Sequence, residues 1–291
     1  MNEQELLDQI DTINIWERSG ERAPHKPLLV LLTLSKYQKS GSRLLDFPSI
    51  KEELKILLKE FGPYRKNYHP EYPFWYLKTD GFWEVQHPEI IKYRKGKPEP
   101  LFSEFNTPEF KAGFNTSFFN EFQNDPSLLV KVAQRILSTH FPGTIHEDIC
   151  LSLGLNLEAQ PTLKTSRDPN FRLQVLKAYR FECAICGYNL RLANTPVGLE
   201  AAHIKWYQAG GACEVTNGLA LCATHHKLFD RGAFTIDKNF NLKYSEWLNG
   251  EFGILGQHSL GDNLKVRVPF NKELVPNQES LAWHREQVFQ P

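Results

Sequence analysis

Two pairs of side chains that can bind a soft metal share one spacing in the second half of the chain. Cys183 and Cys186 form a Cys-x2-Cys pair, and Cys222 and His225 repeat that spacing. A tetrahedral structural zinc takes four sulfur and nitrogen ligands of this kind from two short loops. The sequence therefore predicts a Zn²⁺ site made by these four residues.

Three polar residues in the same segment are of the types that hydrolyse a phosphodiester. They are His203, Asn217 and His226. A neutral imidazole can take a proton from water near pH 7, and a hard divalent cation can polarise a phosphate oxygen. The zinc spacing alone would equally suit a zinc-ribbon-like DNA-binding module without catalysis. The joint presence of the three polar residues favours hydrolysis.

The segment resembles the HNH endonucleases, a ββα-metal nuclease family, over residues 171–244. The matching flanks are Ala201-Ala-His-Ile, Asn217-Gly-Leu-x-Leu-Cys and His-His-x-Leu-Phe229-Asp230. The resemblance implies that His203 is the general base and that Asn217 orients the base or braces the loop. It also implies that His226 binds a catalytic divalent metal, Mg²⁺ or Mn²⁺.

The adjacent histidines His225 and His226 need different partners. Consecutive residues of a helix differ in direction by about 100°, so one imidazole can face the zinc while the other faces the catalytic cleft. The spacing from Cys222 favours zinc for His225 and catalysis for His226. The reverse assignment stays open.

The chain departs from the family at the residue before the base. Many HNH sites have an acid or a histidine there, which helps to hold the metal, whereas this chain has Ala202. A further ligand is therefore expected, with Glu200 and Asp230 as candidates, although a structural role is favoured for each. Glu200 lies three residues before His203 on an expected strand, which puts the two on opposite faces.

Two motifs in the first half of the chain combine basic and aromatic residues. One begins at Arg22 and contains His25 and Lys26 before Pro27, and the other is Tyr72-Pro-Phe-Trp-Tyr76. Together they resemble the DNA sulfur-binding domain of McrA-type restriction endonucleases, which recognise phosphorothioate DNA.

This resemblance implies a set of DNA-binding residues. The phosphate contacts would be His25 and Lys26, with Arg18 and Arg22 as further contacts. The apolar cavity for the sulfur would be formed by Tyr72, Pro73 and Tyr76. Tyr76 is bulkier than the small residue that can occur at its position. The alternative is that the aromatic motif is simply the edge of a core.

Apolar periodicity predicts the elements that position these residues. Helices are expected over residues 2–14, 28–34, 50–61, 108–141, 171–179 and 280–289. Ser49 is expected to cap the third of them, and the phenylalanines of residues 108–141 are assigned to the core rather than to base stacking. Loops and short strands are expected over residues 62–90, and further strands over 199–202, 234–236 and 242–244.

The predicted fold class is α+β in two domains. A mostly helical DNA-reading domain is expected over residues 1–156, and an HNH ββα-metal domain with a structural zinc over residues 171–291. The stretch 157–170 loses apolar periodicity and is expected to be a linker.

Composition limits the class of protein. No run of about 18 apolar residues occurs, so no transmembrane helix is expected. Five cysteines, three of them at metal spacing, favour a reducing cytoplasm, and Cys150 and Cys213 are expected to be ordinary thiols. The 34 basic and 34 acidic residues balance, which argues against a nonspecific DNA coat. Local basic runs at residues 64–66 and 92–97 could still contact phosphate.

The predicted function is that of a modification-dependent restriction endonuclease. It would recognise phosphorothioate-modified double-stranded DNA and hydrolyse nearby phosphodiester bonds with a divalent metal. The alternatives are a methylcytosine-dependent HNH endonuclease and a modified-DNA reader that does not cleave. One HNH site cuts one strand, so a double-strand break would require a homodimer or two successive nicks.

Overall fold

The computed structural model describes residues 3–15, 21, 23–95, 100–157, 169–250 and 264–291. Most of the expected linker, and the candidate phosphate contacts Arg18 and Arg22, lie outside these residues. The chain forms two compact units. The first holds most of residues 3–157, and the second holds residues 169–250 and 264–291 together with the short segment Pro142–Ile145.

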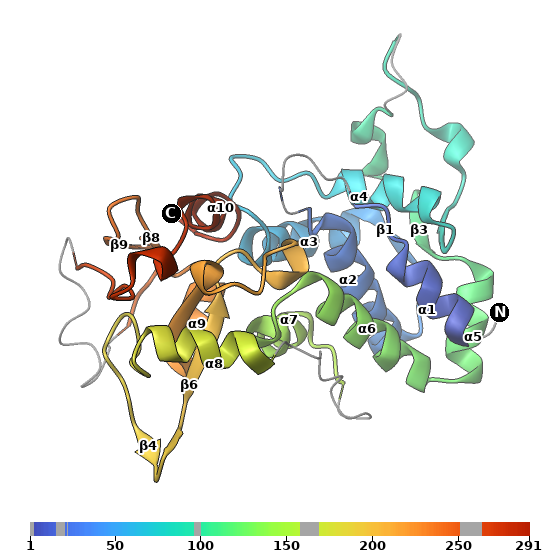
Figure 1. The fold of residues 1–291 in the computed structure, drawn as a ribbon. Coiled ribbons are helices and arrows are strands. Elements are labelled where there is room, and N and C mark those ends of the chain that lie inside the picture. The colour runs from blue at the N-terminus through green and yellow to red at the C-terminus, as the bar shows by residue number, and fades with distance from the viewer. Residues whose placement is uncertain (1–2, 16–20, 22, 96–99, 158–168, 251–263) are drawn as a thin grey trace. The chain divides into compact units, whose positions relative to one another are not determined.

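The first unit is mostly helical, as predicted. Its helices are α1 (Glu3–Asp11), α2 (His25–Ser40), α3 (Phe47–Phe61), α4 (Glu71–Tyr76), α5 (Thr116–Asn124), α6 (Ser127–His140) and α7 (His146–Leu153). Helix α2 is the central one and packs against α3, α4, α6 and α7 (Figure 1). Every residue from Pro27 to Ser35 is buried, which accounts for the almost continuous apolar sequence of this part of the helix.

A small antiparallel sheet completes the first unit. Its strands β1 (Leu44–Asp46), β3 (Lys111–Phe114) and β2 (Trp83–Val85) lie side by side in that order. The helix expected from residue 108 was therefore wrong at its start. A Cβ at Gly113 would lie 2.0 Å from the carbonyl oxygen of Arg43, so this close strand pairing requires glycine. The phenylalanines Phe110, Phe114, Phe118 and Phe122 are buried core residues, as expected.

Two further local expectations were wrong. Helix α3 begins at Phe47, earlier than expected, and its cap is the Asp46 side chain, which accepts a hydrogen bond from the Ser49 backbone amide at 3.0 Å. Ser49 thus lies inside the helix. Residues 62–90 include α4 as well as loops and strand β2, so the aromatic motif Tyr72–Tyr76 lies on a helix.

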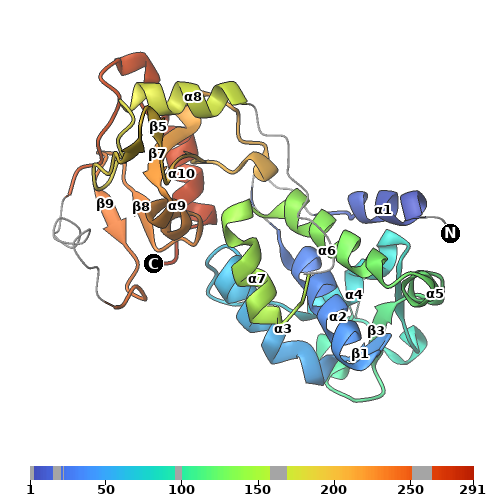
Figure 2. The same ribbon diagram turned by 90° about the horizontal axis from the view of Figure 1, so that it is seen from below.

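The second unit is built around a hairpin followed directly by a helix. Its elements are α8 (Pro169–Ala178), β4 (Arg191–Leu192), β5 (Thr195–Pro196), β6 (Leu199–His203), β7 (Gly218–Cys222), α9 (Ala223–Asp230), β8 (Phe234–Ile236), β9 (Leu242–Tyr244) and α10 (Gln278–Gln287). Strands β6 and β7 are antiparallel, and α8 and α9 both pack against them (Figure 2). This ββα arrangement and the helical first unit confirm the α+β class.

The described helices include none whose length and apolar character would allow it to cross a membrane.

Candidate functional site

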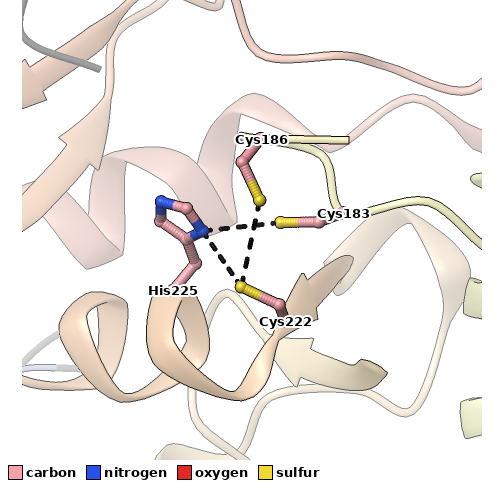
Figure 3. A group of neighbouring side chains, drawn as sticks. All are labelled: Cys183, Cys186, Cys222 and His225. Carbon is pink, nitrogen blue, oxygen red and sulfur yellow. Dashed lines mark hydrogen bonds between the residues drawn. The ribbon is translucent and has the colours of Figure 1, made fainter. Parts of the chain in front are cut away.

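Three cysteines and one histidine come together in the second unit. Cys183 and Cys186 lie in the turn after α8, Cys222 ends β7, and His225 lies in the first turn of α9. Their four ligand atoms all lie within 4.8 Å of one another, and in the part of the chain that the structure describes this is the one such group (Figure 3).

The distances within this cluster suit a tetrahedral zinc. The Nδ1 atom of His225 is 3.1 Å from the Cys222 sulfur and 3.7 Å from the Cys183 sulfur, and the sulfurs of Cys186 and Cys222 are 4.0 Å apart. Ligand atoms around a tetrahedral zinc lie about 3.5 to 3.8 Å apart. Arg267 supports the turn because its guanidinium donates to the carbonyl of Ile185 at 3.1 Å. The residues present therefore fit a structural zinc.

His226 faces different partners from its neighbour His225. Its Nδ1 lies 2.6 Å from a carboxylate oxygen of Glu200, and its Nε2 lies 3.2 Å from a carboxylate oxygen of Asp230. The structure thus places His225, rather than His226, with the cysteines. Burial lowers the pKa of His226, but the carboxylates of Asp230 and Glu200 outweigh burial and raise this pKa to about 9.

His203 ends strand β6 and lies against α8. The Phe171 ring stacks on its imidazole with ring centroids 4.1 Å apart. Its Nε2 lies 3.5 Å from the sulfur of Cys213. In the β-hairpin, His203 is paired with Gly218 of β7. A Cβ added at Gly218 would lie 2.4 Å from a methyl carbon of Val175, which belongs to α8. Glycine at this position therefore lets α8 approach the histidine.

Cys213 is a residue of the site that the sequence did not reveal. It was expected to be an ordinary thiol, yet its sulfur contacts the candidate base. No ligand spacing marks it, because the contact depends on how the loop between β6 and β7 folds back.

Asn217 braces that loop. Its amide nitrogen donates to the carbonyls of Lys205 at 3.0 Å and Ala212 at 2.9 Å, and its amide oxygen accepts from the Lys205 backbone amide at 2.9 Å. The side chain is buried. Of the two roles that the resemblance allows, these contacts match bracing.

We expect Asn217→Ala to lower the free energy of unfolding of the second unit by about 1–3 kcal/mol. The change removes three hydrogen bonds to backbone groups of the loop, but water can replace part of them because Lys205 is only partly buried and Ala212 is exposed. The expected loss is therefore about that of one unsatisfied buried polar group. Urea unfolding followed by tryptophan fluorescence measures the effect. Asn239→Ala, at an exposed turn, is the control. Unchanged stability of the Asn217 variant would contradict the bracing role.

The N-terminal end of α2 carries a basic cluster. Burial, together with the nearby charges of Arg65 and His69, lowers the pKa of His25 to about 4. His25 is therefore neutral near pH 7 and lies close to two other basic side chains. Arg65 belongs to one of the basic runs noted in the sequence.

Lys26 is engaged by a carboxylate. Its ammonium lies 2.6 Å from Asp80, and both side chains are largely buried. Removing Lys26 would leave a buried carboxylate without its ion pair. An ammonium has three donors, so this pair leaves others for a phosphate.

The two tyrosines of the aromatic motif point outward from α4. Tyr72 and Tyr76 are each 39% exposed, and their ring centroids lie 6.3 Å apart, as expected for residues four apart on a helix. The ring of Tyr72 also stacks on that of His69, with ring centroids 5.0 Å apart. Pro73, which follows Tyr72 in the sequence, is buried. The core side of the same helix is formed by Phe74 and Trp75. The motif therefore supplies both a core edge and an exposed aromatic pair.

Comparisons with known protein families match both halves of the chain. The family described as "ScoMcrA-like, DNA sulfur-binding domain" matches residues 3–158. The family described as "HNH endonuclease" matches residues 183–237. A comparison with curated proteins found no match.

Several solved structures match part of the chain at low identity. The sulfur-binding domain of ScoMcrA complexed with phosphorothioated DNA is 20% identical, with a TM-score of 0.44, over 52% of this chain and 98% of that one. The corresponding domain of SprMcrA, also complexed with phosphorothioated DNA, is 18% identical, with a TM-score of 0.44, over 53% and 95%. The Type IV phosphorothioation-dependent restriction endonuclease ScoMcrA is 18% identical, with a TM-score of 0.43, over 54% of this chain and only 35% of that one.

Proposed function

Because the chain belongs to the family of the ScoMcrA-like DNA sulfur-binding domain and also carries an HNH endonuclease domain, we propose that it cleaves DNA that carries phosphorothioate. The first domain binds duplex DNA at the modified phosphate, and the second hydrolyses a phosphodiester bond nearby. The observation that carries this proposal is the presence of both domains in one chain. Residues 1–156 and 171–291 are the proposed limits of the two domains.

Recognition of the modified phosphate is assigned to the end of α2 and to α4. The exposed pair Tyr72 and Tyr76, with Pro73, offers an apolar surface, and the basic cluster of His25, Arg65 and His69 lies in the same unit. Sulfur is more polarisable than oxygen and a weaker hydrogen-bond acceptor. An apolar cavity therefore gains dispersion contacts with sulfur, whereas an unpaired polar oxygen would cost about 2–7 kcal/mol. Lys26, Arg18 and Arg22 are proposed as further phosphate contacts.

Cleavage is assigned to three residues of the second unit. His203 accepts a proton from the attacking water, with its ring held by Phe171 and Cys213. Asn217 keeps the loop beside the base closed, and His226 is the proposed ligand of the catalytic cation. When bound, Mg²⁺ or Mn²⁺ supplies a Lewis acid for the phosphate and its leaving oxygen.

The cysteine cluster has a structural role in this proposal. Zinc held by Cys183, Cys186, Cys222 and His225 ties the start of α9 to the turn after α8. The next residue on α9 is His226. The zinc thus positions the helix that carries the proposed catalytic ligand.

The decisive test compares two plasmids that differ only in phosphorothioate modification. Each is incubated with the full, zinc-loaded chain and with Mg²⁺ or Mn²⁺, and nicked and linear products are separated on a gel. We expect cleavage of the modified plasmid alone. Cleavage of a methylcytosine plasmid instead would favour a methylcytosine-dependent nuclease, and binding without cleavage would favour a silent reader. Nicks that precede linear product would show that the two strands are cut in succession rather than in one step.

We expect the chain to prefer a duplex with one sulfur by roughly 100-fold, which corresponds to about 2.7 kcal/mol. The measurement is a titration with duplexes that differ only in that sulfur, using the His203→Ala chain, in which cleavage is expected to be abolished. Pro73→Asp should remove the preference, because a carboxylate would make the proposed apolar surface polar and repel the phosphate. Since Pro73 is buried, a melting curve of this variant checks that the first unit stays folded.

Arg65→Ala is the matched comparison for this titration. It should weaken binding of both duplexes equally and reduce the salt dependence, since it removes a charge near the proposed phosphate site without changing Tyr72, Pro73 or Tyr76. This variant is preferable to Lys26→Ala, which would also leave Asp80 unpaired. Equal affinity of the parent chain for the two duplexes would end the sulfur proposal.

A further inference from the structure

His226 lies between two carboxylates that differ in their surroundings. The side chain of Asp230 is almost fully buried, at 2% exposure, whereas that of Glu200 is 44% exposed. Asp230 lies at the Nε2 side of the imidazole and Glu200 at the Nδ1 side, 2.6 Å away. One ring nitrogen therefore faces the protein interior and the other faces a carboxylate that water can reach.

We propose that Glu200 and His226 together bind the catalytic divalent cation, and that Asp230 positions His226 for this role. The inference rests on the proposed nuclease function and adds two residues to it. The cation is held through Nδ1 of His226 and a carboxylate oxygen of Glu200, and its remaining positions are open to water and to the DNA phosphate.

The buried carboxylate selects the nitrogen that binds. A neutral imidazole has one N–H donor and one lone pair. Asp230 accepts the proton on Nε2 and holds it there, so a cation that binds displaces the proton from Nδ1, and the lone pair that this frees faces Glu200. Histidines that bind metals commonly donate their other N–H to a carboxylate in this way, and the partner fixes the ring orientation.

The exposed carboxylate suits the cation. Mg²⁺ and similar hard cations take carboxylate oxygens and keep several waters, so a partly exposed acid is a better ligand for them than a fully buried one. Neighbouring ligands of an octahedral cation at 2.0–2.1 Å lie about 3 Å apart. The Glu200 oxygen and the Nδ1 atom are already close to this separation.

The placement of Glu200 follows from strand alternation. On β6, Glu200 and Ala202 point to one face and His203 to the other. His203 contacts Phe171 of α8, whereas Glu200 contacts His226 of α9. Ala202 is buried and has no ligand atom, so Glu200 is the residue on this face of β6 that can share a cation with α9. In the sequence analysis, the position of Glu200 on the face opposite to His203 argued against a role as ligand. In the structure, that same position brings Glu200 into contact with α9.

The test measures binding of Mn²⁺ alone to the full, zinc-loaded chain by electron paramagnetic resonance. We expect Glu200→Gln to weaken Mn²⁺ binding at least roughly 10-fold while zinc content and melting temperature stay unchanged. Asp230→Asn should weaken it by roughly 10- to 100-fold, the usual effect of losing such a partner. Glu246→Gln, an exposed glutamate of the same unit, is the control and should change nothing.

A spectroscopic readout separates ligand from positioning residue. Pulsed measurements on bound Mn²⁺ should detect coupling to an imidazole nitrogen in the parent chain and in Glu200→Gln. The coupling should be lost in Asp230→Asn, since an amide can donate to Nε2 and move the ring proton to Nδ1. If burial makes Asp230→Asn unfold, Glu200→Gln still decides the question, because Glu200 is partly exposed.

The outcomes separate this inference from the proposed function. Cleavage of modified DNA by the parent chain, together with unweakened Mn²⁺ binding by Glu200→Gln, would overturn the inference and leave the function standing. Binding of Mn²⁺ that depends on Glu200, without cleavage of any DNA, would support the site and overturn the function. A parent chain that binds no Mn²⁺ at concentrations supporting cleavage would also overturn the inference.

Discussion

His203→Ala is expected to abolish cleavage of modified DNA while affinity for that DNA stays within a few fold. A positioned general base contributes about 10²- to 10⁴-fold to the rate, so the variant should lose activity by at least that factor. Binding should persist because the proposed contacts with the modified phosphate lie in the first unit. Single-turnover cleavage and a binding titration on the same duplex measure the two effects.

The control for this prediction is His87→Ala, an exposed histidine of the first unit. It should leave both the rate and the affinity unchanged. A cleavage rate of His203→Ala equal to that of the parent would exclude the role of general base. A parallel loss of DNA affinity would place His203 in binding instead.

Loss of the zinc site should have the second large effect. The purified chain is expected to hold about one zinc per molecule, and Cys183→Ser should lose it and unfold the second unit at a much lower temperature. Binding of a structural zinc contributes about 10–16 kcal/mol in small zinc domains, and this energy is folding energy. Elemental analysis and a melting curve measure the two quantities.

Cys150→Ser provides a matched control, because Cys150 lies on α7, outside the cluster. It should keep both the zinc and the melting transition of the second unit. DNA binding by the first unit should survive in Cys183→Ser. A metal-free preparation with an unchanged melting transition would count against the zinc assignment.

Local patterns predicted the elements whose cause is local. Helix α2 follows from an unbroken apolar stretch after Pro27, and the hairpin of β8 and β9 from two short apolar runs around a turn. The helix expected over residues 108–141 failed at its start because Phe110 and Phe114 are spaced as on a helix. Strand β3, which follows Phe110 and ends at Phe114, is decided by pairing with β1, whose residues lie far away in the sequence.

The proposed zinc ligands and the candidate nuclease residues His203, Asn217 and His226 could be proposed from the sequence, because residue type and spacing within one short segment single them out. The partners of those residues were decided by tertiary structure. Glu200 meets His226 only when α9 packs on one face of β6, and Cys213 meets His203 only when the loop closes on Asn217. The ion pair between Lys26 and Asp80 likewise joins residues that are 54 positions apart in the sequence. Spacing determines which groups can share a ligand within a turn or a helix, whereas a contact between distant groups depends on how the elements pack, which no local pattern contains.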